Sequence, residues 1–309
     1  MVGWTRLKKW IIGFALLLVG LLVLAVVVVA GTYLVLDHTN GEITSSGVVR
    51  KYLVYEPESY DPASPVPLVI SIHGYADWPA HQAEVSHWNE LADEYGFIVV
   101  YPSGTGFPPR WNAYNLQVGG VDSNAEVQFI ADLIDKLSDD YNIDTTRIYA
   151  NGLSNGGAMA VLLACRLADS VTAIGGVSGA YLLPRDQCAP SRPVPIIVFH
   201  GTEDPIVAYG GGEIMRTGLF FPDVPAWIAS WAGLNGCDPT PLELPPRGEV
   251  GGVRYTQCRQ GADVVFYTVH GGGHAWPGGV KLPEMIVGHT TRDIDATRVM
   301  WDFFNKYSR

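Results

Sequence analysis

The hydrophobic pattern divides the 309-residue chain into an apolar N-terminal stretch and a long body with alternating patterns. Residues 10–36 contain no charged side chain, and Arg6, Lys8 and Lys9 come shortly before them. As a helix, these 27 residues extend about 40 Å at ~1.5 Å each, which exceeds a hydrocarbon core of about 30 Å. The pattern therefore predicts a transmembrane helix within residues 1–36, with its basic flank in the cytoplasm.

A cleaved signal peptide is the alternative, because Val28-Val29-Ala30 fits a small-residue cleavage site. Secretory hydrophobic regions usually run only about 7–15 residues, which favours an uncleaved anchor. Residues 37–47 are polar and small, and they are expected to form a stalk. In either case residues 48–309 lie on the extracytoplasmic side, held at the membrane by the anchor or secreted after cleavage.

Strand and helix patterns alternate along residues 48–309. Short apolar runs, typical of buried strands, and one alternating run occupy 50–55, 67–72, 97–101, 148–150, 194–199 and 264–269. Helical spacing of apolar residues occupies 123–141, 155–168 and 296–307, the first after a capping box that starts at Ser123 and the last near Asp293 or Asp295. Strands alternating with helices predict a single α/β domain with a mostly parallel central sheet flanked by helices.

Charge and composition narrow the possible partners. The chain has a net charge of −11, and residues 37–309 carry −14 once the three basic residues near the N-terminus are set aside. Because phosphate contact needs a basic excess, nucleic acid is an improbable partner. The acidic body is not attracted to anionic lipid, so membrane attachment depends on the N-terminal segment.

All four cysteines lie in the body, at Cys165, Cys188, Cys237 and Cys258. An even count in an oxidising compartment predicts two disulfides. Three pairings are possible, and the short loops favour Cys165–Cys188 and Cys237–Cys258. No Cys-x-x-Cys pair or closely spaced Cys/His set occurs, so no metal site is expected.

The segment Gly152-Leu153-Ser154-Asn155-Gly156 matches G-x-S-x-G. It follows the predicted strand at 148–150 and opens the predicted helix at 155–168. Such a sharp strand-to-helix turn needs glycines, because the serine lies in strained backbone geometry and its close neighbours leave no room for a Cβ. The alternative is that Ser154 only caps the helix.

A serine nucleophile also needs a base and an acid, which in this kind of fold follow later strands in the order Ser, Asp or Glu, His. Asp204, before Pro205, is the preferred acid, with Glu203 as its rival. His274 is the preferred base, since three glycines before it suggest a flexible loop, and His270 competes with it. The other histidines are expected to be solvated or structural: His38, His81, His87, His200 and His289.

Two backbone amides should bind the oxyanion of the tetrahedral intermediate. The N–H of Asn155 is one, and the N–H of Tyr75, after the strand at 67–72, is the other. His73 is expected to support that loop. Three tryptophans on adjoining loops are candidate substrate-binding residues, with packing as the alternative: Trp78, Trp111 and Trp276.

These motifs together resemble the polyhydroxybutyrate depolymerase and feruloyl esterase-like family of extracellular α/β-hydrolase serine esterases. The matching segments are His73-Gly74, Gly152–Gly157, His200-Gly-Thr-Glu-Asp204-Pro and His274-Ala-Trp-Pro-Gly278. The resemblance spans about residues 48–308 and implies an α/β-hydrolase fold. It also implies that Ser154 is the nucleophile, Asp204 the acid and His274 the base.

The sequence thus predicts an extracytoplasmic serine carboxylesterase that needs no cofactor and acts on feruloyl, acetyl or hydroxyalkanoate esters. A peptidase or an acyltransferase would use the same triad. A catalytically inactive surface-binding protein is the alternative from another class. Neither the exact ester nor the oligomeric state follows from the sequence.

Overall fold

The computed structural model describes residues 10, 13–24, 31, 38–114, 122–214 and 220–309. The chain divides into two compact units, Met1–His38 and Thr39–Arg309.

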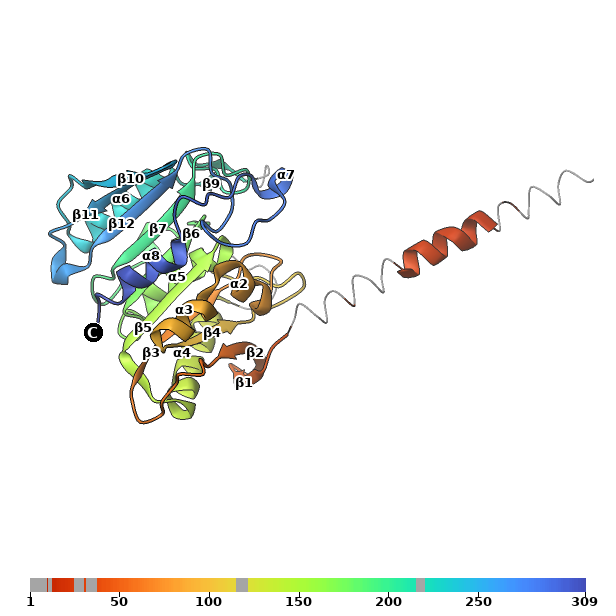
Figure 1. Ribbon diagram of the computed structural model, residues 1–309, viewed down its shortest axis with the longest axis horizontal. Helices are drawn as coiled ribbons and strands as arrows, with labels where there is room; N and C mark the ends of the chain where they lie inside the picture. The colour runs from red at the N-terminus through yellow and green to blue at the C-terminus, as the bar shows by residue number, and fades with distance from the viewer. Residues whose placement is uncertain (1–9, 11–12, 25–30, 32–37, 115–121, 215–219) are drawn as a thin grey trace, which may run out of the picture. The chain divides into compact units, whose positions relative to one another are not determined.

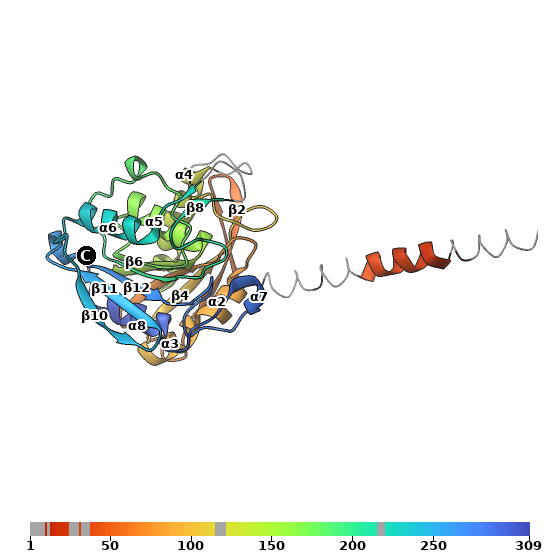
Figure 2. The ribbon, with the colours of Figure 1, turned by 90° about the horizontal axis from the view of Figure 1, so that it is seen from above.

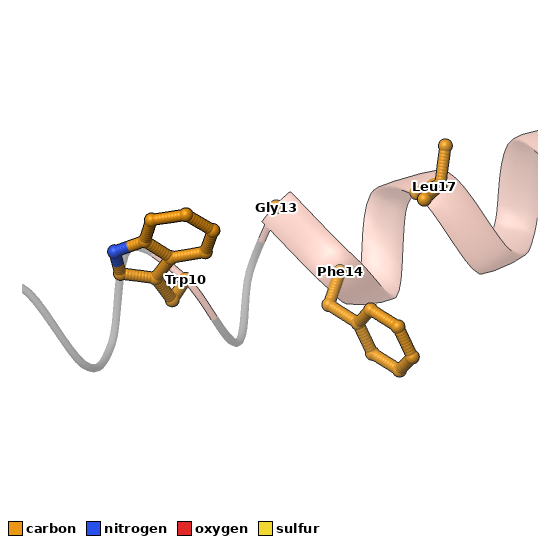
Figure 3. A pocket seen from close by; sticks show the side chains of 4 residues that line it. All are labelled: Trp10, Gly13, Phe14 and Leu17. Carbon is orange, nitrogen blue, oxygen red and sulfur yellow. The ribbon is translucent and has the colours of Figure 1, made fainter.

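In the N-terminal unit, residues 13–24 are helical and their apolar side chains are exposed. Figure 3 shows Gly13, Phe14 and Leu17 on this helix, and Trp10 before it. Within the described ranges, no helix has both the length and the hydropathy needed to cross a membrane. The predicted span at 10–36 is described only in part, because residues 11–12, 25–30 and 32–37 lie outside the described residues, as do the basic flank and the cleavage motif.

The unit Thr39–Arg309 is built on a ten-stranded sheet, in the order β1-β2-β4-β3-β5-β6-β7-β12-β11-β10 (Figure 1). Its strands are β1 Gly41–Ser45, β2 Val48–Tyr55, β3 Val66–Ile72, β4 Ile98–Pro102, β5 Ile143–Leu153, β6 Ala173–Val177, β7 Ile196–Gly201, β10 Leu242–Arg247, β11 Val250–Tyr255 and β12 Val264–Val269. A separate short hairpin pairs β8 Gly212–Glu213 with β9 Phe220–Phe221. The six central strands, from β4 to β12, are parallel, so their carboxyl ends share one edge of the sheet.

Helices cover both faces of this sheet. They are α2 Pro79–Ser86, α3 Trp88–Tyr95, α4 Ser123–Asp140, α5 Asn155–Arg166, α6 Val224–Asn235, α7 Glu284–Val287 and α8 Ala296–Phe304. Successive strand residues point to opposite faces, so Leu68 and Ile70 join the core under α4, α5 and α6, while Val69 joins the core under α3 and α8 (Figure 2). The result is the predicted mostly parallel sheet flanked by helices.

The six predicted strands overlap β2, β3, β4, β5, β7 and β12, and the three predicted helices overlap α4, α5 and α8. The prediction of a stalk at residues 37–47 is corrected by the structure. Residues 41–45 form β1, an edge strand paired antiparallel with β2. Ser46 and Gly47 have φ angles of 50° and 77°, which suit the two-residue turn of a tight hairpin. Ser45 is buried, so this polar segment belongs to the folded body.

The start of α4 also differs from the expected capping box. Asp122, not Ser123, is the N-cap residue, and its carboxylate accepts a hydrogen bond from the N–H of Ala125 at 2.7 Å. Asp295 caps α8 in the same way, through the N–H of Arg298 at 3.0 Å. A carboxylate at this position satisfies one of the free amides of the first turn.

Both predicted disulfides are confirmed. Cys165 in α5 is bonded to Cys188, and Cys237 after α6 is bonded to Cys258. Each bridge closes a loop of about twenty residues on the face of the sheet that α5 and α6 cover. Such a bridge limits the conformations open to the unfolded protein.

Candidate active site

Ser154 lies at the turn between β5 and α5, where a strand passes directly into a helix. Its φ and ψ angles are 56° and −116°, a conformation that side chains other than glycine rarely adopt. Its N–H donates to the carbonyl of Val177 at 2.9 Å, which fixes the turn to the end of β6. The side chain makes no N-cap hydrogen bond, so the alternative of a simple helix cap does not describe this serine.

Glycines on both sides of Ser154 allow the backbones to approach closely. A Cβ on Gly156 would fall on the carbonyl oxygen of Ile72 and lie 2.6 Å from that of His73. A Cβ on Gly152 would meet the backbone of Gly156. The start of α5 is therefore packed directly against the carboxyl end of β3, as the G-x-S-x-G pattern requires.

Asp204 follows β7, and its carboxylate has a full set of donors. Its Oδ1 accepts hydrogen bonds from the N–H groups of Ile206 and Val207, both at 2.8 Å. Its Oδ2 lies 2.8 Å from Nδ1 of His274. Burial by itself raises the pKa of Asp204, but the hydrogen bond with His274 and the other donors outweigh it, so the pKa lies below its ordinary value.

The choice between Asp204 and Glu203 is made by side-chain direction. Asp204 is only 7% exposed and faces His274, whereas the side chain of Glu203 points into solvent. The acid that the sequence favours is therefore the one that meets an imidazole.

His274 follows β12 on a segment that is packed, not flexible as the three preceding glycines suggested. The N–H of His274 donates to the carbonyl of Val287, and that of Gly273 to the carbonyl of His289. A Cβ on Gly273 would lie 2.6 Å from the Cα of Gly288. The glycines allow this close packing, which fixes the position of the imidazole.

His270, the rival base, is exposed at the end of β12. Within the part of the chain that the structure describes, its imidazole has no hydrogen-bond or ion-pair partner, so no acid orients it as Asp204 orients His274. Among the described residues, no group of three His, Cys, Asp or Glu side chains could hold a metal ion.

The loop after β3 lies against Ser154. A Cβ on Gly74 would be 3.5 Å from the Cβ of Ser154, an ordinary van der Waals contact. In the described portion of the chain, the N–H groups of Tyr75 and Asn155 have no hydrogen-bond acceptor. The neighbouring N–H of Ala76 is engaged by the carbonyl of Pro109. The backbone N–H groups of Tyr75 and Asn155 are thus available as donors beside Ser154.

His73 supports this loop, as expected. Its Nε2 accepts a hydrogen bond from the N–H of Gly104 at 2.9 Å, which leaves the proton on Nδ1 to be donated to the carbonyl of Gly74 at 2.7 Å. The side chain of Asn155 is bound on the same side, with Oδ1 accepting from the N–H of Trp111 at 2.7 Å. The segment after β4 therefore holds both proposed oxyanion donors in place.

The three tryptophans have different places in the fold. Trp111 is 2% exposed and donates its indole N–H to the carbonyl of His73, and Trp276 is 1% exposed and donates to Thr297. Both indoles belong to the packed interior, which corrects their expected place on a cleft surface. Trp78 is half-buried on the loop after Tyr75 and keeps its candidacy as a substrate-binding residue.

A buried ion pair beside the segment after β4 was not predicted from the sequence. Arg50 on β2 lies 2.8 Å from Glu126 on α4, and its guanidinium is 3.9 Å from the ring centre of Phe129. Glu126 also accepts a hydrogen bond from Thr105. The pair joins β2, α4 and the segment that carries Trp111. The sequence pattern had assigned Glu126 to a capping box, so this pairing was not expected.

The structure thus joins Asp204 to His274 and places Ser154 at the same edge of the sheet. Ser154 is half-buried as a residue, and within the described residues its hydroxyl has no hydrogen-bond partner, His274 included. Before substrate binds, hydrogen bonds between a nucleophile and its base are often long, and they tighten only in the substrate complex.

Comparison with known proteins connects this geometry to a family. Residues 51–189 match the family model described as Esterase PHB depolymerase. Feruloyl esterase D of Neurospora crassa is 29% identical over 287 residues, covering 87% of each chain. These similarities support a PHB depolymerase and feruloyl esterase-like family for this chain.

Two further relatives are much longer than this chain. A bifunctional acetylxylan esterase/xylanase of Neocallimastix patriciarum is 34% identical over 163 residues, which are 53% of this chain and 22% of that protein. Feruloyl esterase B of Piromyces equi is 30% identical over 234 residues, covering 73% and 42% respectively. The chain therefore spans less than half the length of these two relatives.

Solved structures establish the fold. An acetyl xylan esterase from Aspergillus awamori superposes with a TM-score of 0.58 at 15% identity, covering 86% of this chain and 98% of that one. The feruloyl esterase module from Clostridium thermocellum superposes with a TM-score of 0.54 at 17% identity, covering 76% and 81%. The fold is α/β-hydrolase-like, as expected.

Proposed function

We propose that this protein is a serine carboxylic-ester hydrolase, with Ser154 as nucleophile, His274 as general base and Asp204 as the acid that orients it. The observation that carries the proposal is the buried hydrogen bond between Asp204 and His274, at the same sheet edge as the strained turn of Ser154. A buried carboxylate paired with an imidazole beside such a turn is the arrangement that activates a hydroxyl.

In the first half-reaction, Ser154 Oγ attacks the ester carbonyl carbon and its proton passes to Nε2 of His274. The N–H groups of Tyr75 and Asn155 donate to the resulting oxyanion. His274 then gives the proton to the leaving alcohol as the C–O bond breaks, which leaves an acyl group on Ser154. In the second half-reaction, water attacks the acyl group with His274 again as base, and the acid product and free Ser154 are released.

Asp204 keeps its charge throughout this cycle. The contact of Asp204 Oδ2 with Nδ1 of His274 fixes the imidazole so that Nε2 of His274 is free for Ser154. The carboxylate of Asp204 also stabilises the imidazolium that forms. The lowered pKa of Asp204 supports this role, because a protonated carboxyl group would lose that stabilisation.

The substrates that we propose are feruloyl, acetyl or hydroxyalkanoate esters. Relatives named feruloyl esterase and acetylxylan esterase support the first two classes, and the match to the PHB depolymerase family supports the third. Trp78 and the exposed ring of Tyr75, on the loop beside Ser154, are the proposed contacts for the acyl or phenolic group.

We also propose that the N-terminal segment anchors the protein in a membrane, with the catalytic unit on the extracytoplasmic side. The charge-free stretch at 10–36 and the exposed apolar side chains of the helical residues 13–24 support the anchor. The two disulfides support the location, because such bonds persist in oxidising compartments.

The experiment compares wild type, Ser154→Ala and the control Ser138→Ala in hydrolysis of p-nitrophenyl acetate. Ser138 lies on α4, where, among the described residues, its hydroxyl bonds only to the carbonyl of Ile134. We expect Ser154→Ala to lower kcat/KM by at least about 10³-fold, because the nucleophile is lost, and the control to be unchanged. Circular dichroism checks that both variants are folded, and near-normal turnover by Ser154→Ala would refute the proposal.

A further inference from the structure

A second histidine lies beside the acid, and the proposed reaction does not use it. His200 is the penultimate residue of β7 and is 1% exposed. Its Nε2 lies 2.8 Å from the carbonyl oxygen of Val207 and 3.4 Å from Oδ2 of Asp204. The sequence alone had placed this residue among the solvated or structural histidines.

The contacts of His200 define its tautomer. A carbonyl oxygen can only accept, so Nε2 carries the proton and donates it to Val207. Nδ1 is buried and has no partner among the described residues. Burial holds the pKa of His200 below its ordinary value, which agrees with a neutral ring protonated at Nε2 only.

Val207 connects His200 to Asp204 through two hydrogen bonds. Its carbonyl accepts from His200, and its own N–H donates to Oδ1 of Asp204 at 2.8 Å. The N–H of Ile206, one residue earlier in the same short loop, donates to the same oxygen. The rotation of the Asp204 carboxylate, and with it the direction of Oδ2 toward His274, therefore depends on where Val207 is held.

We propose that His200 is a positioning residue for the triad: its Nε2–H fixes the loop of Asp204 through the Val207 carbonyl, so that the acid faces His274. In the proposed reaction His200 touches no reacting atom, and it acts through Asp204. The inference rests on the proposed function, because it assigns Asp204 and His274 to catalysis.

Few other charged or titratable groups face the ring. Asp204 and His274 interact with it electrostatically, and the ring of Tyr209 lies 6.1 Å away between centres. His289 borders the same cavity of about 10 Å³ as His200. The Nε2 donor is thus the feature of His200 that a substitution can test.

The experiment uses His200→Gln and His200→Met in the full chain. Both side chains fill a similar volume, but only the glutamine amide can place a donor where Nε2 lies. Active sites are counted with a fluorophosphonate, and kcat and KM for p-nitrophenyl acetate are expressed per titrated site. Because misfolded molecules are not titrated, a merely structural role would leave kcat per site unchanged.

We expect His200→Gln to retain kcat within about threefold, and His200→Met to lose about 10- to 100-fold in kcat with KM nearly unchanged, because a misplaced base costs rate more than binding. Equal kcat per site in both variants, whether retained or lost, would overturn the inference. If His200→Met does not fold, His200→Asn replaces it, because its shorter amide cannot reach Val207.

A second readout separates this inference from the proposed function. The proton between His274 Nδ1 and Asp204 gives a far-downfield ¹H NMR signal, which we expect in wild type and His200→Gln and not in His200→Met. If wild type neither hydrolyses esters nor reacts with the fluorophosphonate, the proposed function fails, and this signal still tests the positioning. An unchanged signal in His200→Met would contradict it.

Discussion

Two glycines in helices show how the same residue type serves different purposes. Gly156, at the start of α5, lies where any Cβ would strike the carbonyl oxygens of Ile72 and His73. Gly233, inside α6, has nothing within 4 Å of the same position. Only the first glycine is required by the packing, because backbone atoms cannot move aside as a flexible side chain can.

Gly156→Ala and Gly233→Ala should therefore have opposite effects. We expect Gly156→Ala to lower the free energy of unfolding by about 1–3 kcal/mol through overpacking. We expect Gly233→Ala to raise it by about 0.4–1 kcal/mol, because alanine restricts the unfolded chain. Urea unfolding of the two variants measures both values, and a Gly156→Ala variant as stable as wild type would contradict the close approach.

Residue patterns identified the candidate triad but not the buried polar contacts around it. The order of Ser154, Asp204 and His274 could be predicted because each follows a recognisable strand. Glu126 pairs with Arg50, and His200 contacts Val207. Both contacts depend on the tertiary packing of elements and loops, which a local sequence pattern does not give. The local pattern favoured a capping box for Glu126, and for His200 it offered only a solvated or structural role without a partner.

At the scale of elements, the long buried strands were predictable and the atypical ones were not. Strands such as β3 are buried on both faces, so they appear as continuous apolar runs. The central strand β6 was missed because Gly175 and Gly176 interrupt the apolar pattern. The structure explains both glycines, since a Cβ would strike Met300 on one face and Tyr181 on the other.

Polar edge strands were missed for a different reason. β1 and β10 lie at the two ends of the sheet, and most of their side chains are partly or fully exposed. An edge strand needs no continuous apolar run, and Pro245 and Pro246 in β10 are typical of loops. The polar residues before Val48 were therefore interpreted as a stalk.

At the scale of the molecule, the parallel sheet brings distant parts of the chain together. Ser154, Asp204 and His274 follow β5, β7 and β12, whose carboxyl ends share one edge (Figure 1). Topology can be predicted from alternating strands and helices. Distances between the loops cannot, because they depend on close backbone contacts such as that of Gly273 with Gly288.

The division of the chain at His38 allows a test of the proposed anchor. A fragment that begins at Thr39 keeps the whole sheet and both disulfides, so we expect it to fold and to hydrolyse esters. The full chain should sediment with membranes and resist a high-salt wash, because an apolar segment and not surface charge would hold it. A full chain that stays in the soluble fraction, or is removed by salt, would contradict the anchor.

The proposed mechanism requires that Ser154 is the residue that His274 activates. Mass-spectrometric mapping after reaction with a fluorophosphonate tests this directly, because only an activated hydroxyl attacks the phosphorus. We predict one phosphonyl adduct per chain, on the peptide that contains Ser154, and no adduct in His274→Ala or Ser154→Ala. Modification of another residue, or undiminished labelling of Ser154 without His274, would contradict the assignment.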